Sequence, residues 1–265
     1  IEVDGTAYWM SENGFFMYDG QLKSLPCLVE DYVYDDLNTT SRDLINVGLN
    51  NLFGEVTWFY CTAGSNVIDR MVTYNYLDSN AKRPIWTTGS LARAAWQDSS
   101  VFEKPHATYY NPNSNSSYDV IGNTDGCTTY YQQETGTDQI DAGGAVTAIL
   151  ASITSGDFDI TQRRSNTGTT VGMPDLRGDG EFIMRISRFI PDFIAQTGST
   201  RVSFVTRTYP NSSSTTSNFD ITSSTTKKDT RLRARSIALK VSNTAASQDW
   251  KLGTFRLDIH PGGRR

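Results

Sequence analysis

Few side chains in this sequence are of a type and spacing that suit catalysis. Six carboxylates near the start of the chain are candidates for the acid and base of a glycosidase: Glu12, Asp19, Glu30, Asp31, Asp35 and Asp36. A glycosidase needs two carboxylates that flank the bond to be cut, and Trp9 near Glu12 would be a local platform for a sugar ring. Acidic residues in turns are more often solvated or bonded to backbone groups. We therefore expect no catalytic pair.

The nucleophilic and metal-binding residues form no recognisable arrangement either. His106 and His260 lie next to prolines, and the sequence has no GxSxG turn to hold a serine nucleophile. Cys27, Cys61 and Cys127 are far apart and lack the close spacing of zinc ligands, so we expect three buried thiols and no disulfide framework. There is no phosphate-binding GxxxxGK[ST] loop. We expect no enzyme, no cofactor and no metal.

Two kinds of short motif have an ordinary explanation. Arg177-Gly178-Asp179 spells an adhesion tripeptide, but such triplets arise by chance, and a tight turn before the next strand is the simpler account. Asn38-Thr39-Thr40, Asn115-Ser116-Ser117 and Asn211-Ser212-Ser213 match the N-glycosylation sequon. A sequon matters only in a secreted chain, and no signal peptide opens this sequence. Neither kind of motif predicts a function.

The arginines of the second half follow strand spacing. Arg185 and Arg188 are three residues apart, which in a regular strand places them on opposite faces. Arg231, Arg233 and Arg235 alternate with Leu232 and Ala234, so they share one face. Such a charged stripe is usually solvated. The alternative is contact with an acidic partner subunit or with a polyphosphate backbone.

Composition narrows the class of protein. The chain has 265 residues, of which 37% are hydrophobic and 11% aromatic, enough for a packed core. Its formal net charge of -5 argues against tight binding of nucleic acid but not against surrounding nucleic acid loosely. No apolar run approaches the ~20 residues needed to cross a bilayer. The first residue is Ile1, not Met, and we expect the chain to be part of a longer one.

Short strands dominate the predicted secondary structure. The stretch from Ile45 to Asp98 contains four of them, rich in β-branched and aromatic residues and separated by turns: 45–49, 55–61, 69–76 and 84–88. This pattern predicts one antiparallel meander. A lone meander cannot bury both faces, so similar sheets must lie beside it, as in the blades of a propeller.

The rest of the chain continues in the same style. Before the meander we expect a hairpin over 7–20, an edge strand over 21–27 and a helical turn or connection over 30–38. After it we expect a second round of strands: 91–96, 106–110, 118–121 and 128–133. The composition changes after Gly136, where strands are expected over 179–190, 201–209, 231–241 and 250–259. Residues 210–226 are rich in Ser and Thr and predict an exposed arm. The predicted class is all-β, with propeller-like blades over 1–135 and a sandwich-like or additional β domain over 136–265.

Several segments, taken in order, resemble a family of bacteriophage tail proteins. Gly14-Phe15-Phe16-Met17-Tyr18-Asp19-Gly20, Glu55-Val56-Thr57-Trp58-Phe59-Tyr60 and Arg93-Ala94-Ala95-Trp96-Gln97-Asp98 are similar to its blade motifs. Arg188-Phe189-Ile190-Pro191-Asp192-Phe193 and Trp250-Lys251-Leu252-Gly253, with the closing Gly-Arg-Arg, are similar to its C-terminal region. The family is the tail nozzle, or packaged-DNA stabilisation protein. Its members are typically longer, with further blades before the position of Ile1.

The resemblance implies a structural virion protein in the phage tail. Six copies would form a ring that extends the DNA channel below the head-tail connector and retains packaged DNA until ejection. The implied partners are the adaptor and portal proteins, the tail fibres and the viral DNA, which passes without sequence-specific binding; no membrane is involved in the resting particle. Two alternatives stay open: a propeller that binds or cleaves glycans, and a soluble interaction module without a viral role.

Overall fold

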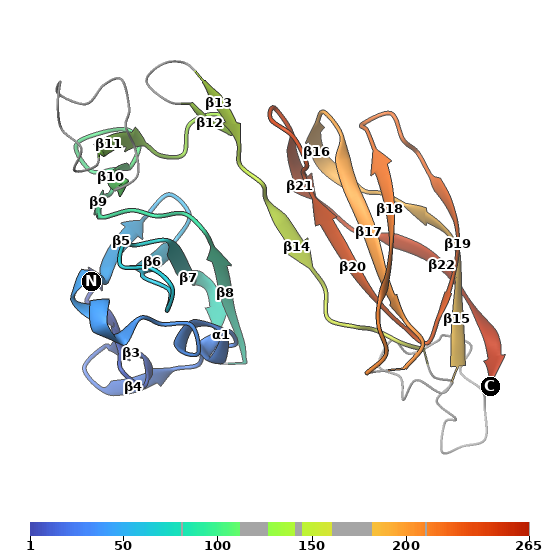
Figure 1. The fold of residues 1–265 in the computed structure, drawn as a ribbon, viewed down its shortest axis with the longest axis horizontal. Coiled ribbons are helices and arrows are strands. Elements are labelled where there is room, and N and C mark those ends of the chain that lie inside the picture. Colours follow the sequence, from blue (N-terminus) through green and yellow to red (C-terminus); the bar gives the residue numbers. More distant parts are fainter. Residues whose placement is uncertain (81, 112–126, 141–144, 161–181, 210, 265) are drawn as a thin grey trace. The chain divides into compact units, whose positions relative to one another are not determined.

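The chain folds into two compact units, Ile1–Thr135 and Gly136–Arg265. A computed structural model describes residues 1–80, 82–111, 127–140, 145–160, 182–209 and 211–264. Nearly all regular structure in these residues is antiparallel strand, with two short helices (Figure 1). The prediction of an all-β protein is therefore confirmed. The division falls where the sequence changes in composition.

The first unit begins with a four-stranded meander. Its strands pair in chain order: β1 (Glu2–Val3), β2 (Thr6–Ser11), β3 (Gly14–Tyr18) and β4 (Leu22–Leu25). The predicted hairpin and edge strand correspond to β2, β3 and β4, whereas β1 was not anticipated. Gly14 opens β3 at φ 128°, a conformation that favours glycine. Its carbonyl and that of Ser11 accept hydrogen bonds from the Tyr34 hydroxyl, which fixes the hairpin to the helix that follows.

Two short helices connect this sheet to the next. Helix α1 (Glu30–Tyr34) is the predicted helical turn, and a 3-10 helix, η1 (Thr39–Leu44), follows it. Asn38 caps η1 because its side-chain oxygen accepts hydrogen bonds from the backbone N–H groups of Thr40 and Ser41. The second sheet is the predicted meander, again in chain order: β5 (Asn46–Asn50), β6 (Glu55–Tyr60), β7 (Arg70–Asn80) and β8 (Arg83–Gly89).

One aromatic core joins the first two sheets. Val56 and Trp58, alternate residues of β6, are buried against Phe15 of β3. The ring centroids of Phe15 and Trp58 are 5.0 Å apart. Trp86 of β8 donates its indole N–H to the carbonyl of Pro26, over 2.8 Å. The first sheet thus packs against one face of the second.

A third sheet covers the opposite face of the second. It contains three antiparallel strands: β9 (Ala95–Gln97), β10 (His106–Asn111) and β11 (Cys127–Gln132). Trp96 of β9 stacks on Phe59 at a centroid distance of 5.8 Å and donates its indole N–H to the carbonyl of Leu49 over 2.7 Å. A Cβ at Gly48 would lie 2.6 Å from Trp96 Cγ, so the close approach of β9 to β5 requires glycine there.

Three sheets are therefore stacked in the order of the chain, with β5–β8 in the middle (Figure 1). Among the described residues these sheets do not close into a barrel or a complete propeller. The strand expected over 118–121 lies outside the described residues. The strands expected over 106–110 and 128–133 are confirmed as β10 and β11.

The second unit contains two facing sheets and two separate strand pairs. One sheet has the strand order β14 (Ser152–Thr154), β20 (Ser236–Ser242), β17 (Thr200–Arg207) and β18 (Thr215–Ile221). The other has the order β19 (Lys228–Ala234), β15 (Phe182–Ile190) and β22 (Arg256–Arg264). The separate pairs are β12 (Asp138–Ile140) with β13 (Val146–Ala148), and β16 (Phe193–Thr197) with β21 (Asp249–Leu252).

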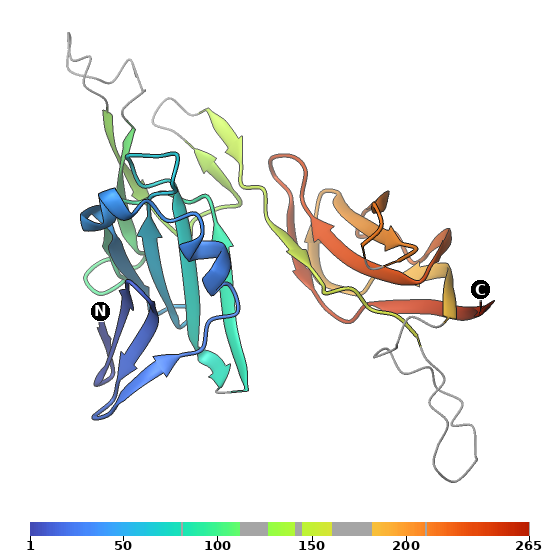
Figure 2. The ribbon, with the colours of Figure 1, turned by 60° about the horizontal axis from the view of Figure 1, so that its bottom comes forward.

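The core of this unit lies between the two facing sheets, which Figure 2 shows one over the other. Phe189 of β15 is fully buried, and its ring centroid lies 5.5 Å from that of Phe204 on β17. The rings of Phe219 on β18 and of Phe255 also pack against the Phe189 ring, each with a centroid-to-centroid distance of 5.7 Å. Residues of both sheets thus bury one shared aromatic cluster.

Three expectations for this unit were wrong. Residues 215–221 of the expected Ser/Thr-rich arm form β18, which pairs with β17 along its whole length. Ser and Thr suit this edge strand because one face is solvated, whereas Phe219 and Ile221 reach the core. The strand expected over 231–241 is two strands, β19 and β20, which belong to different sheets because the chain bends at Arg235. Likewise, the strand expected over 250–259 is divided into β21 and β22.

Candidate interaction face

The outer face of the β19-β15-β22 sheet carries most of the arginines singled out in the sequence. A β-bulge shifts the register of β15 between Ile186 and Arg188, on both neighbouring strands. Ile186 and Phe189 are both fully buried, so the extra residue turns Arg188 outward beside Arg185. The expectation that Arg185 and Arg188 lie on opposite faces was therefore wrong.

One row across this sheet consists of basic side chains. Arg185 lies directly opposite Arg233 of β19 and directly opposite His260 of β22. All three residues are exposed. Like charges that face each other across two strands destabilise a sheet, and no carboxylate of a described residue lies in this row. We call Arg233, Arg185 and His260 the basic row.

The adjacent row is neutralised within the sheet. Arg188 lies opposite Asp229 on one side and Asp258 on the other, and its Nε donates to Asp258 Oδ2 over 2.7 Å. Farther along β22, Arg256 approaches Asp192 at 3.9 Å. Arg188 and Arg256 thus have carboxylates beside them, whereas the basic row has no facing carboxylate.

The predicted stripe of three arginines is confirmed only in part. Arg231 and Arg233 are exposed, while Leu232 packs against the core and Thr230 is buried, with its hydroxyl donating to the Ile186 carbonyl. Arg235 lies in the bend after β19, where its guanidinium is 5.6 Å from the centre of the Tyr209 ring. The outer residues of this sheet together form the arginine face: Arg185, Arg188, Arg231, Arg233, Arg256 and His260.

The two units carry opposite net charge. Residues 1–135 contain 7 Lys and Arg against 17 Asp and Glu, a formal charge of -10. Residues 136–265 contain 17 Lys and Arg against 12 Asp and Glu, a formal charge of +5. The whole-chain value of -5 hides this asymmetry, which could have been found by counting each predicted domain separately.

Two of the six candidate carboxylates are held in ion pairs. Glu12 makes an ion pair with Arg42. Asp19 makes one with Lys23 at 2.6 Å, and this hydrogen-bonded ammonium lowers the pKa of Asp19. Glu30, Asp31, Asp35 and Asp36 belong to α1 and the residues that follow it. Trp9 stacks on Phe16 at a centroid distance of 5.9 Å.

Neither histidine lies in a nucleophilic arrangement of described residues. His106 is in β10, where its ring contacts Phe102 at a centroid distance of 4.5 Å and its Nδ1 is hydrogen-bonded to the Tyr130 hydroxyl. The other histidine, His260, belongs to the basic row.

The thiols are mostly as expected. Cys61 is buried, and Cys27 is half-buried; both are free. Burial raises the pKa of Cys27 to about 11 and also raises that of Cys61, so both stay protonated at neutral pH and are poor nucleophiles. The side chain of Cys127 lies outside the described residues.

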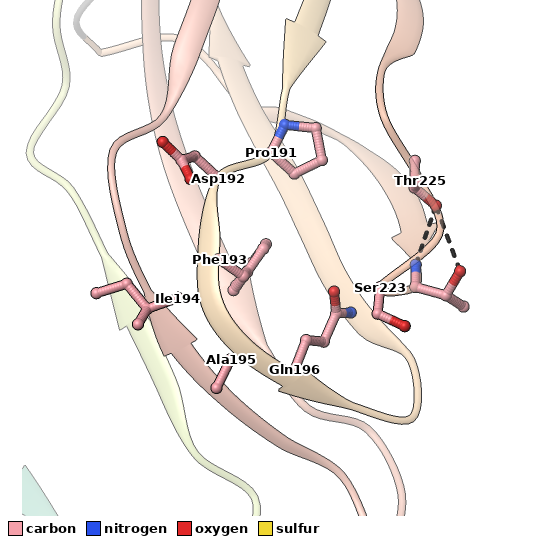
Figure 3. A pocket seen from close by; sticks show the side chains of 9 residues that line it. Pro191, Asp192, Phe193, Ile194, Ala195, Gln196, Ser223 and Thr225 are labelled. Atoms are coloured by element: carbon pink, nitrogen blue, oxygen red, sulfur yellow. Dashed lines mark hydrogen bonds between the residues drawn. The ribbon is translucent and has the colours of Figure 1, made fainter.

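Two pockets of the second unit are each lined by a single carboxylate. A cavity of about 240 Å³ lies between β16 and the turn after β18, and Figure 3 shows Gln196 and Ser223 on its two sides. Gln196 already donates to Thr200 and to the Ile221 carbonyl, and Asp192 is the only ionisable residue of the lining. A cavity of about 330 Å³ likewise contains one carboxylate, Asp249. Neither is lined by any of the six candidate carboxylates.

Within the part of the chain that the structure describes, no three His, Cys, Asp or Glu side chains are grouped as metal ligands. In the same residues, no helix is long and apolar enough to cross a membrane. Arg177-Gly178-Asp179 and Asn115-Ser116-Ser117 lie outside the described residues. Ser212 of the third sequon closes a turn by donating its hydroxyl to the Tyr209 carbonyl.

Comparison of the sequence with protein-family models and with curated proteins gives no match.

Proposed function

We propose that this chain is a structural subunit of a phage tail nozzle, which extends the DNA channel below the head-tail connector and retains packaged DNA until ejection. In this proposal, residues 1–135 are blades of a propeller, residues 136–265 are an additional β domain, and six copies form a ring. The chain contributes contacts and a channel wall, and no catalytic step.

The observation that carries the proposal is the stacking of three consecutive meanders in chain order. A propeller is built from antiparallel sheets of four strands, each packed against the next around an axis. The sheet β5–β8 has β1–β4 on one face and β9–β11 on the other, as consecutive blades would. The same segments carry the motifs that resemble the family's blades.

The charge of the first unit is also suited to a DNA channel. A basic wall would release counterions from DNA and bind it, which would hold the DNA in place. A wall that belongs to a unit of charge -10 lets a polyanion slide past. The glycan alternative is weaker because Glu12 is paired with Arg42 and Trp9 is stacked on Phe16.

Phage particles that lack this chain test the proposal. The phage that encodes it would be grown with an amber mutation in the gene, and the particles would be treated with nuclease. We expect capsids to form and the packaged DNA to become nuclease-sensitive, with recovery when the wild-type chain is supplied in trans. Particles that retain protected DNA and a complete tail without this chain would refute the proposal. Purified wild-type chain should also cleave no oligosaccharide.

A further inference from the structure

We propose that the arginine face of one copy docks on the acidic α1 segment of a second copy, so that copies assemble head to tail. This inference rests on one part of the proposed function, that the chain forms a homo-oligomer. It does not require that the oligomer belongs to a virion. It assigns the two surfaces that meet at the subunit interface. Within the arginine face, the basic row has no carboxylate of its own sheet opposite it.

The acidic α1 segment is defined as residues 28–43, in which four of the five carboxylates are exposed and Glu30 is half-buried. It contains five carboxylates: Glu30, Asp31, Asp35, Asp36 and Asp43. The one basic residue of this range, Arg42, pairs with Glu12 outside it. Asp31 and Asp35 are four residues apart in α1, where like charges repel, and Asp35 caps the negative end of the helix dipole.

Apolar side chains accompany these carboxylates. Leu28 is 77% exposed and Tyr32 is 56% exposed, so both offer apolar area beside the acids. On the arginine face, Ile190 lies opposite Arg256 and is 37% exposed. Interfaces typically combine Tyr and Arg contacts with apolar area in this way. Both surfaces thus have the mixed character of a protein interface.

The observations favour a second copy over nucleic acid as the partner of the arginine face. A phosphate backbone would approach a molecule of net charge -5 and would meet Asp229 and Asp258 in the row next to the basic row. A second copy instead offers the α1 carboxylates to the basic row, and its unit charge of -10 complements the +5 of the second unit.

Contact between two unlike surfaces of the same chain has a structural consequence. Such an interface is heterologous, and an open assembly keeps an unused arginine face at one end and an unused α1 segment at the other. If the rotation between neighbours closes, the assembly is a ring. The α1 segment belongs to the first unit and the arginine face to the second, so each copy contains one of each.

Paired charge reversals test the proposal. Variant R185E/R233E reverses the basic row, and D31K/D35K reverses part of the α1 segment. K240E/K251E is the matched control, since it changes the same charge in the same unit on β20 and β21, away from the arginine face. Molecular mass would be measured by mass photometry and light scattering over a range of concentration and salt, and circular dichroism would check folding.

We expect the wild type and the control to form oligomers that weaken as salt rises. Each reversal variant should associate about 100-fold more weakly, because like charges then face each other. An equimolar mixture of the two variants should restore the oligomer, because each reversed surface meets its reversed counterpart. A misfolded variant could not be rescued by mixing, so this result separates docking from stability.

Three results of the mass measurements would overturn the inference. These are a wild type that stays monomeric at tens of micromolar, variants that assemble as well as the wild type, and folded variants that do not complement each other when mixed. If R185E/R233E loses binding to a fluorescent 30-mer DNA while its oligomer is unchanged, the partner is nucleic acid and the inference is wrong. If particles without this chain keep their DNA protected from nuclease, but the two reversal variants still restore the oligomer when mixed, only the proposed tail function is refuted.

Discussion

Replacing Gly48 with alanine should destabilise the first unit because it separates β9 from β5. The new Cβ would lie 2.6 Å from Cγ and 2.9 Å from Cδ2 of the Trp96 ring, closer than packed carbon atoms approach. Trp96 must move, yet it is held between Phe59 and the Leu49 carbonyl. The clash therefore tests whether the third sheet packs against the second.

The expected loss is about 2 kcal/mol. Overpacking a filled site typically costs about 1–3 kcal/mol. Moving Trp96 also forfeits its hydrogen bond to the Leu49 carbonyl, a loss of about 1 kcal/mol. Against this, alanine is favoured over glycine within a strand by about 0.5–1 kcal/mol. Because the opposing effect is the smaller one, the variant should be less stable than the wild type.

Urea unfolding followed by tryptophan fluorescence measures this change. Four of the five tryptophans belong to residues 1–135, so the signal reports mainly on the first unit. Gly64→Ala is the matched control, because a Cβ there would meet nothing within 4 Å. The double variant G48A/W96A should cost less than the sum of the two single changes. A Gly48→Ala variant within about 0.5 kcal/mol of the wild type would refute the packing argument.

Three further predictions address the cores and the titrating groups. Phe189→Ala should destabilise the second unit by about 3–5 kcal/mol, because a fully buried ring with three aromatic neighbours leaves a cavity; an unchanged urea midpoint would contradict this. Burial and the nearby Glu134 raise the pKa of Glu55, so the folded state binds this proton more tightly and stability falls as pH rises through that pKa. Glu55→Gln should therefore raise the melting temperature at pH 7 but not below the ordinary glutamate pKa, and a loss at pH 7 would argue against it. Because the pKa of Cys27 is about 11, its alkylation at pH 8, followed by mass spectrometry, should be about 100-fold slower than that of a free thiol; an equal rate would show an exposed thiol.

Much of the fold follows from local patterns in the sequence. The alternation of aromatic and β-branched residues in 55–60 and 70–76 specifies β6 and β7, and the turns around Gly54 and Gly64 separate them from their neighbours. These strands pair with their sequence neighbours, so no long-range information is needed. The antiparallel hairpin β2–β3 was predictable for the same reason.

The second unit was harder to predict because its strands pair across long sequence distances. Nothing local shows that 228–234 and 236–242 belong to different sheets, since the break at Arg235 is one residue in an otherwise strand-like run. No local sequence pattern indicates the β-bulge in β15 either. The bulge places Arg185 and Arg188 on the same face of the sheet, whereas regular strand spacing would place them on opposite faces. The basic row appears only once the register of three strands is known.

A reconstruction of the intact phage tail by electron cryomicroscopy tests the central claim most directly. We predict six copies of this chain around the DNA axis below the connector, with β1–β4, β5–β8 and β9–β11 as successive blades of one propeller. In that map, Arg185 and Arg233 of each copy should lie against α1 of its neighbour. A map in which this chain is absent from the tail, or lies on its outside away from the DNA, would contradict the account.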